Sequence, residues 1–366
     1  MKKRILIITA NFYPILGPRA HRSTELAKGL AKNGHEVIVY TLCGKYDYTE
    51  FENTHKVKVR DLGSSDSGLL HNDGYINLSI INRIKIKLFK KYLQYPFILL
   101  LFKTYKVLKK ETNYDTLITI AHPHTIHWGA GMFFKKYSKR CTWIADCGDP
   151  FMNNPFNKYP IYFKYFEHSW CKLVDYITIP VEEAKGGYYE QYLNKIKIIP
   201  QGFQMESIMR AEYSKNSIPT FAYSGVFYKD FRDPTSFLKY LSTLDIDFKF
   251  IVYTKSNNFL QPFIDVLGSK LEIRDYVPRD ELIFELSKMD FLINIINESS
   301  VQQPSKLIDY YLTNRPIIDI TSKFNQIENF ENYLKFNFIK AHNYRDIRQY
   351  DIINVVSNFE QLFYEN

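Results

Sequence analysis

The sequence predicts an α/β protein built from two doubly wound parallel-sheet domains. Its 366 residues suffice for two domains of ordinary size. Short apolar runs alternate with helical patterns, an order that is typical of parallel βα units. The alternation stops in the polar, irregular stretch 203–219 and then begins again.

We therefore place a first domain at 1–203 and a second at 204–349, and we expect an amphipathic helix at 350–366. Ligands of open α/β sheets bind beyond the carboxyl ends of the strands, so two such domains facing a cleft would bind their ligand there. The expected strands are 5–9, 36–41, 116–120, 142–145, 176–179 and 197–199 in the first half, and 220–224, 248–253, 271–276, 291–296 and 316–320 in the second.

Charge and cysteine usage narrow the classes of partner. Lys and Arg number 48 against 39 Asp and Glu, a formal charge of +9 that attracts nucleotides, nucleic acids or anionic membranes. No helix-turn-helix, RNA-recognition or zinc-finger pattern accompanies this charge, so we expect no nucleic-acid partner.

The four cysteines lack CxxC spacing and no His/Cys cluster has zinc-site spacing, which predicts reduced thiols in the cytoplasm and no metal. No apolar run reaches the about 20 residues that a membrane span needs.

The turn after the first expected strand has the features of a phosphate-binding site. Gly17 permits a sharp turn or the close approach of a ligand, and Pro18 suits the first position of a helix. The free N–H groups of that helix, with Arg19 and Arg22, favour a phosphate. An ordinary βα turn with solvated arginines accounts for the same residues, because the GxGxxG pattern is absent.

Polar groups also follow two later strands of the first half. His122 and His124 follow the strand 116–120, and Asp146 and Asp149 end or follow the strand 142–145. Imidazole titrates near neutrality and can hold or move the proton of an acceptor hydroxyl, so these groups are candidates for catalysis. They can equally be strand-end residues without a role, and Asp149-Pro150 can be a turn former.

A glycine and two basic residues follow the first strand of the second half. Gly225 permits close approach, and Lys229 and Arg232 can face a phosphate; a solvated loop is the alternative. Farther on, Ser305 can cap a helix, and Lys306 adds charge to the N-terminus of that helix. Asp309 lies one turn later, where it can accept hydrogen bonds from ribose hydroxyls.

The segment 82–110 is basic and apolar at once. It holds nine Lys or Arg and no acidic residue, and Pro96 divides it into two expected helices. A basic amphipathic helix can lie on an anionic membrane surface. Two surface helices that pack their apolar side on the sheet are the alternative.

Several motifs resemble those of GT-B glycosyltransferases of family 4. FYP-x-x-G-x-x-x-H at 12–21 and ELAKGLAKNGHEVIVYT at 25–41 resemble the N-terminal signature of that family. The stretch 143–151 resembles the D-x-x-D-P-W element of one branch, with Cys147-Gly148 in place of Phe-Arg and Phe151 in place of Trp. QPSKLIDY at 303–310 resembles the family's PSKL-x-E-Y helix start.

The resemblance implies the GT-B fold, with an acceptor domain first, a nucleotide-sugar domain second and a last helix that crosses back to the first. It places Gly17 beside the donor diphosphate and the loop that begins at Tyr276 beside the nucleobase. It equates Asp309 with the second Glu of the family's E-x7-E motif, whose first Glu falls here at Val301.

Together, these features predict a retaining, metal-independent bacterial glycosyltransferase. The donor would be a UDP- or GDP-linked hexose or N-acetylhexosamine, which is a substrate, so no cofactor is expected. The acceptor would be a glycan or polyprenyl-linked intermediate of surface polysaccharide, and the enzyme would be cytoplasmic, with a peripheral contact to the inner membrane face if 82–110 binds lipid. The catalytic candidates are His122, His124 and Asp149, and the donor-binding candidates are Gly17, Arg19, Gly225, Lys229, Arg232, Tyr276, Ser305, Lys306 and Asp309.

Two other functions fit the same architecture. A nucleotide-sugar epimerase would act on a UDP-sugar without an acceptor. A catalytically degenerate subunit would bind a partner transferase, and Val301 is the residue that favours this alternative.

Overall fold

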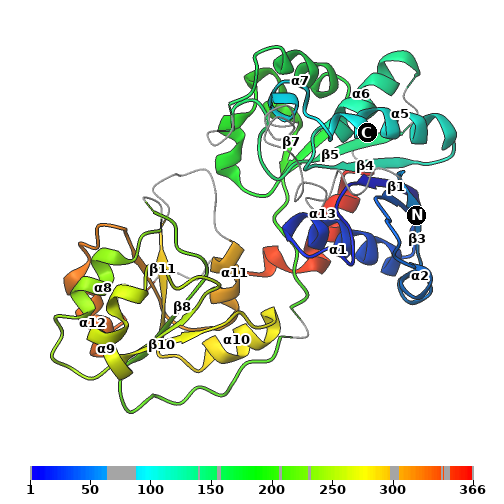
Figure 1. Cartoon of the computed structure of the whole chain (residues 1–366). Coiled ribbons are helices and arrows are strands. Elements are labelled where there is room, and N and C mark those ends of the chain that lie inside the picture. Colours follow the sequence, from blue (N-terminus) through cyan, green and yellow to red (C-terminus); the bar gives the residue numbers. More distant parts are fainter. Residues whose placement is uncertain are drawn as a thin grey trace. The chain divides into compact units, whose positions relative to one another are not determined.

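The protein forms two compact units, one made of Met1–Phe203 with Gln349–Asn366 and the other of Gln204–Arg348 (Figure 1). The computed structural model describes residues 2–63, 88–138, 141–154, 158–205, 208–229, 232–296, 305–338, 341 and 347–364. The predicted residues 82–87, Val301 and Gln303 lie outside these ranges. No helix within them is long and apolar enough to cross a membrane.

The first unit contains a seven-stranded parallel sheet in the order β3-β2-β1-β4-β5-β6-β7. The strand order reverses between β1 and β4, and such a switch point is where open α/β sheets bind ligands. The central strands read as continuous apolar runs because helices cover both faces of the sheet. The strands are β1 (Arg4–Thr9), β2 (Glu36–Thr41), β3 (Val57–Asp61), β4 (Thr116–Ile120), β5 (Thr142–Asp146), β6 (Tyr176–Ile179) and β7 (Ile196–Ile198).

Alternate residues of the central strand β1 enter two separate cores. Ile5 and Ile7 pack with α1 and α13 on one face, whereas Leu6 and Ile8 pack with α5, α6 and α7 on the other. The helices of this unit are α1 (Pro18–Lys32), α2 (Thr49–His55), α5 (Ile98–Lys110), α6 (Thr125–Lys136), α7 (Phe163–Cys171) and α13 (Ile352–Gln361), with short 3-10 turns η3 (Glu182–Gly187) and η4 (Glu190–Lys195).

The last helix belongs to the first unit, where α13 packs against α1 (Figure 1). A Cβ atom added to Gly29 of α1 would stand 2.4 Å from a methyl group of Val356, so the glycine permits this close approach. The backbone of Phe203 exchanges hydrogen bonds with Tyr350 and Ile352, at 2.8 and 2.9 Å. These contacts join the end of the chain to the end of the first sheet.

The second unit contains a five-stranded parallel sheet in the order β10-β9-β8-β11-β12, which reverses between β8 and β11. One face of it is covered by an aromatic core centred on Phe221, whose ring stacks on Phe291 with centroids 4.8 Å apart. The elements are β8 (Thr220–Ser224), α8 (Thr235–Leu241), β9 (Lys249–Tyr253), η5 (Gln261–Phe263), α9 (Ile264–Leu267), η6 (Gly268–Lys270), β10 (Leu271–Arg274), α10 (Arg279–Ser287), β11 (Phe291–Ile295), α11 (Ser305–Leu312), β12 (Ile317–Ile320) and α12 (Ile327–Leu334). The 3-10 turn η7 (Ile347–Tyr350) spans the boundary between the units.

The prediction of two doubly wound parallel sheets is confirmed, and each expected strand is present with its ends shifted by at most two residues. The sequence analysis missed the edge strand β3. In the basic segment, residues 88–93 are helical and α5 follows after Pro96. Helix α5 buries Leu100 and Leu108 in the core. This half of the segment therefore packs on the sheet, as in the alternative to membrane binding.

Candidate active site

A pocket of about 110 Å³ lies in the first unit, in the loops that follow β4 and β5 and beside the start of α1. The strands that flank the switch point are β1 and β4, and the start of α1 and the β4 loop follow their carboxyl ends, where a ligand is expected. The pocket brings together the three catalytic candidates and one donor-binding candidate. Its lining residues are Arg19, His122, His124, Gly148, Asp149, Pro150, Phe151, Asn154 and Tyr159.

A closed ion pair lies next to this pocket. Arg22 Nη2 donates to Asp146 Oδ1 at 2.7 Å and Arg22 Nε to Oδ2 at 3.2 Å, and Thr178 Oγ1 donates to Oδ1 at 2.7 Å. Burial alone would raise the pKa of Asp146, but the charges and hydrogen bonds of its partners hold that pKa below its ordinary value. Arg22 also donates to the carbonyls of Ile199 and Pro200.

This pair corrects two expectations. Arg22 was expected to reinforce a phosphate site and Asp146 to meet an acceptor, but their side chains are 3% and 1% exposed and neutralise each other. The pair instead joins α1 to the end of β5. Its role is structural.

Arg19 is the arginine that reaches the pocket. Its side chain is 23% exposed, and its Nη1 lies 3.6 Å from Asp146 Oδ2. The guanidinium packs directly on Gly148. A Cβ atom at that position would stand only 2.5 Å from Arg19 Cζ, so the absence of a side chain permits this contact. The preceding residues match the expected turn: Gly17 has a φ of 146°, which favours glycine, and Pro18 begins α1.

The two histidines of the pocket differ in exposure. His122 is exposed, and its ring lies edge-on to Phe97 with centroids 5.1 Å apart. His124 is buried, and its Nε2 lies 3.2 Å from the backbone carbonyl of Asp149. Partial loss of hydration and the nearby charges of Lys90 and Arg19 lower the pKa of His122. Full burial lowers the pKa of His124 further, so both rings are neutral near pH 7. His122 and the exposed Asp149 are therefore the groups that can meet a ligand hydroxyl, while His124 holds the loop.

In the second unit, candidate residues gather near the end of β8. Gly225 follows this strand with a φ of 139°, and its N–H donates to the carbonyl of Tyr253 at 3.0 Å. Ser224 N donates to the hydroxyl of Tyr310 at 2.7 Å, which ties α11 to β8. Lys229 is exposed in the loop that follows, next to a backbone pairing between Tyr228 and Arg232.

Asp309 has an ion-pair partner that the sequence analysis missed. Arg279 Nε and Nη2 lie 2.8 and 2.7 Å from Asp309 Oδ1. Burial raises the pKa of Asp309, and Arg279 opposes this rise. In the loop at 276–279 only Tyr276 was named as a donor-binding candidate, although Arg279, at the start of α10, was a visible basic residue.

The remaining donor-binding candidates are Tyr276, Ser305 and Lys306. Tyr276 is 41% exposed, and Lys255 Nζ lies 5.2 Å from its ring centroid. Ser305 and Lys306 begin α11 as predicted, although their side chains fall outside the described part of the structure.

No protein-family model matches the chain, and no curated protein matches it. Solved structures do match along the whole chain. A glycosyltransferase from Rickettsia africae is 14% identical with a TM-score of 0.65, covering 100% of this chain and 98% of its own. The lipopolysaccharide outer core galactosyltransferase WaaB, in its apo form, is 12% identical with a TM-score of 0.62 over 99% of both chains. Anabaena HepE in complex with UDP-glucose is 8% identical with a TM-score of 0.60 over 98% of both chains.

These matches confirm the predicted GT-B fold. At such low identities they show the fold alone. Membership of family 4 and of its D-x-x-D-P-W branch stays a prediction.

Proposed function

We propose that this protein is a glycosyltransferase that uses a nucleotide-sugar donor. The observation that carries the proposal is the convergence of Arg19, His122 and Asp149 in one pocket at the switch point of a GT-B fold. The complex of HepE with UDP-glucose makes a UDP-sugar the first donor to test. A GDP-sugar is the second.

On the acceptor side, His122 and Asp149 receive or orient the attacking hydroxyl. Both are exposed in the pocket, and a neutral His122 can accept a proton. Arg19 supplies positive charge. The family element that 143–151 resembles has an arginine at the position of Gly148. In this chain Arg19 of α1 places its guanidinium over Gly148 instead.

On the donor side, the second unit supplies the groups that bind the nucleotide and stabilise the departing diphosphate. Fixed cationic groups and helix N-termini aimed at the developing charge are the largest catalytic contribution usually available. With these groups in place the reaction needs no catalytic metal. Retention at the transferred hexose or N-acetylhexosamine is proposed from the resemblance to family 4 alone. The proposed donor-binding residues are Gly17 and Arg19 of the first unit and Gly225, Lys229, Arg232, Tyr276, Ser305, Lys306 and Asp309 of the second.

The acceptor is a glycan or a polyprenyl-linked intermediate of surface polysaccharide. Support for a peripheral contact with the inner membrane face comes from residues 88–93, where Leu88, Phe89 and Leu93 are each about half exposed beside Lys90 and Lys91. Such a surface can bury apolar side chains between anionic headgroups.

A thermal-shift screen of the full chain against UDP, GDP, ADP and their sugars tests the donor. We expect one nucleotide to raise the melting temperature, and stabilisation by none of them would refute the proposal. Product analysis without an acceptor separates the transferase from an epimerase. Donor binding without turnover across a broad acceptor panel would instead identify a degenerate subunit.

Lys306→Ala tests the donor side of the proposal, with Lys323→Ala, outside the proposed site, as a matched control. Loss of a charged hydrogen bond to the diphosphate should raise the KM for the donor by about tenfold or more. Unchanged donor kinetics would remove Lys306 from the site.

A further inference from the structure

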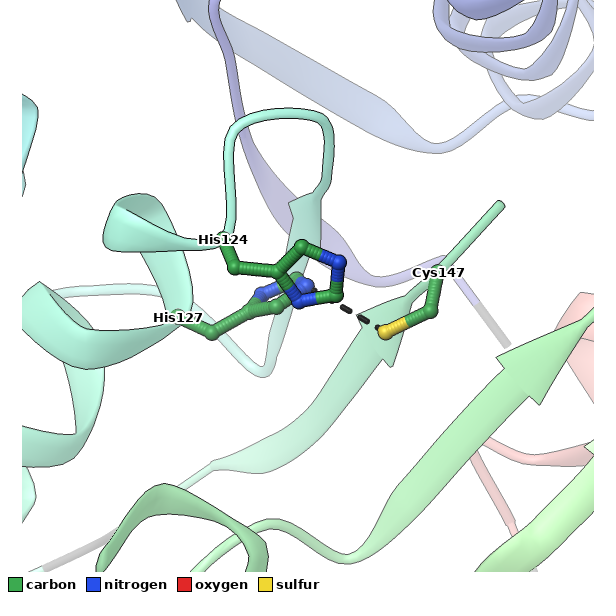
Figure 2. A group of neighbouring side chains, drawn as sticks. All are labelled: His124, His127 and Cys147. Atoms are coloured by element: carbon green, nitrogen blue, oxygen red, sulfur yellow. Dashed lines mark hydrogen bonds between the residues drawn. The ribbon is translucent and has the colours of Figure 1, made fainter. Parts of the chain in front are cut away.

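Two imidazoles and a thiol meet in the interior of the first unit (Figure 2). They belong to His124 and His127, at the start of α6, and to Cys147, directly after β5. One ligand atom from each residue lies within 4.8 Å of the other two, and all three residues are buried. The parallel pairing of β4 with β5, with Ile120 opposite Asp146, brings these segments together.

The hydrogen bonds of His124 leave one nitrogen available. Its Nε2 lies 3.2 Å from the carbonyl oxygen of Asp149, and because a carbonyl only accepts, Nε2 carries the proton. Nδ1 then carries a lone pair. This atom is buried and has no hydrogen-bond partner among the described residues. An unpaired acceptor in the interior is costly unless a ligand satisfies it.

His127 is held in a similar way. Its Nδ1 lies 2.8 Å from Thr119 Oγ1, which also accepts the indole N–H of Trp143 at 2.9 Å. When Nδ1 donates to Thr119, the Nε2 lone pair faces Cys147 Sγ, 3.4 Å away. A histidine that binds a metal usually donates its other ring N–H to an oxygen, and both histidines have an oxygen in that place.

We propose that His124, His127 and Cys147 bind a zinc ion. Zinc prefers nitrogen and sulfur ligands, whereas calcium and magnesium prefer oxygen. Ligand atoms on one tetrahedral zinc lie about 3.5 Å apart, given its usual bond lengths to sulfur and nitrogen. The separation of 3.4 Å between His127 Nε2 and Cys147 Sγ fits this spacing. On binding, zinc takes the place of the Cys147 thiol proton, which is released to solvent.

The ion links the two loops that form the pocket. His124 follows β4 and reaches the carbonyl of Asp149, and Cys147 lies two residues before Asp149. A bound ion would therefore fix His124 as a positioning residue for Asp149. This inference does not rest on the proposed function, because the site needs neither a donor nor an acceptor.

Cobalt substitution tests the site in the full chain. Protein stripped with a chelator should bind one equivalent of Co²⁺ and show a near-ultraviolet band of thiolate-to-cobalt charge transfer, and zinc should abolish this band. Cys147→Ser should lose the band. Cys141→Ser, a change to a cysteine outside the cluster, should keep it.

A wild-type protein without the charge-transfer band would overturn the proposal, as would a band that persists in folded Cys147→Ser. If far-ultraviolet circular dichroism shows that Cys147→Ser does not fold, His127→Gln provides the second test. It keeps the thiol but should weaken Co²⁺ binding by about tenfold or more. Unchanged binding by that variant would also contradict the site.

Discussion

The two units contain the same kind of sheet, but their buried ion pairs differ. In the first unit the side chains of Arg22 and Asp146 are 3% and 1% exposed, and in the second those of Arg279 and Asp309 are 29% and 18% exposed. The first pair is closed to solvent, so it supports the fold and the position of Arg19 without itself being open to a ligand. A pair that solvent reaches can exchange a partner for a ligand, so the second is the better candidate for a binding role.

The units resemble each other in their first turns. Gly17 follows β1 and Gly225 follows β8, with φ angles of 146° and 139° that favour glycine. A glycine in the left-handed region therefore lies in the connection after the first strand of each unit, directly before α1 in the first and directly after β8 in the second. The units differ in the exposure of their ion pairs, which the first of four predictions tests. The other three concern the packing and the pocket of the first unit.

Asp146→Asn should destabilise the first unit by about 3–5 kcal/mol, because it leaves the buried Arg22 charge without a counter-ion. Asp309→Asn should cost the second unit about 1 kcal/mol or less, because solvent reaches that pair. The three tryptophans, at 128, 143 and 170, all belong to the first unit, so tryptophan fluorescence during chemical unfolding measures the effect of Asp146→Asn on that unit. Far-ultraviolet circular dichroism, to which the helices of both units contribute, measures the effect of Asp309→Asn. Equal losses of stability from the two variants would contradict the comparison.

Glu167→Gln should remove a pH-dependent loss of stability in the first unit. Burial raises the pKa of Glu167 to about 7 from an ordinary value of 4.5. The folded protein therefore holds the proton of Glu167 more tightly than the unfolded chain does. The stability that this gives is fully present below about pH 4.5 and is lost as the pH rises to about 7. The loss should approach about 3 kcal/mol, at about 1.4 kcal/mol for each pKa unit.

The measurement for Glu167 is the free energy of unfolding from about pH 5 to about pH 8, followed by tryptophan fluorescence. Subtracting the profile of the glutamine variant isolates Glu167, since the histidines titrate in both proteins. His127, whose pKa burial lowers to about 3, has the opposite slope and cancels in the difference. Parallel profiles would show that Glu167 does not titrate differently on folding.

Gly29→Ala should destabilise the first unit by about 2 kcal/mol, because the new methyl group overlaps the stiff side chain of Val356. Gly186→Ala is the matched control in the same unit, since no atom lies within 4 Å of the Cβ position there. A loss confined to Gly29→Ala in fluorescence-monitored unfolding would show that α13 stabilises the first unit. Equal effects of the two changes would refute this.

Gly148→Ala should lower kcat/KM by about tenfold, or about 1.4 kcal/mol, with little change in unfolding. The added Cβ displaces the flexible end of Arg19, and no backbone has to move. Steady-state kinetics with the donor that the thermal-shift screen selects measures this, with Gly186→Ala as the control. Full activity would mean that the position of Arg19 in the pocket has no role in turnover.

The periodicity of apolar residues determined most of the fold. Continuous apolar runs predicted the central strands of both sheets, because helices cover both faces of those strands. The edge strand β3 was missed because its sequence, VKVRD, alternates buried and exposed residues over only five positions. Local signals were equally informative at Gly17 and Pro18, whose backbone properties do not depend on distant residues.

Which polar groups pair with each other was decided by the tertiary structure. Arg19 and Arg22 lie one turn apart on α1, and nothing local shows that one reaches the pocket while the other neutralises Asp146. The proposed zinc ligands were not predicted from the sequence for the same reason. His124 and Cys147 are distant in sequence, and they meet because the parallel pairing of β4 and β5 sets one loop beside the other.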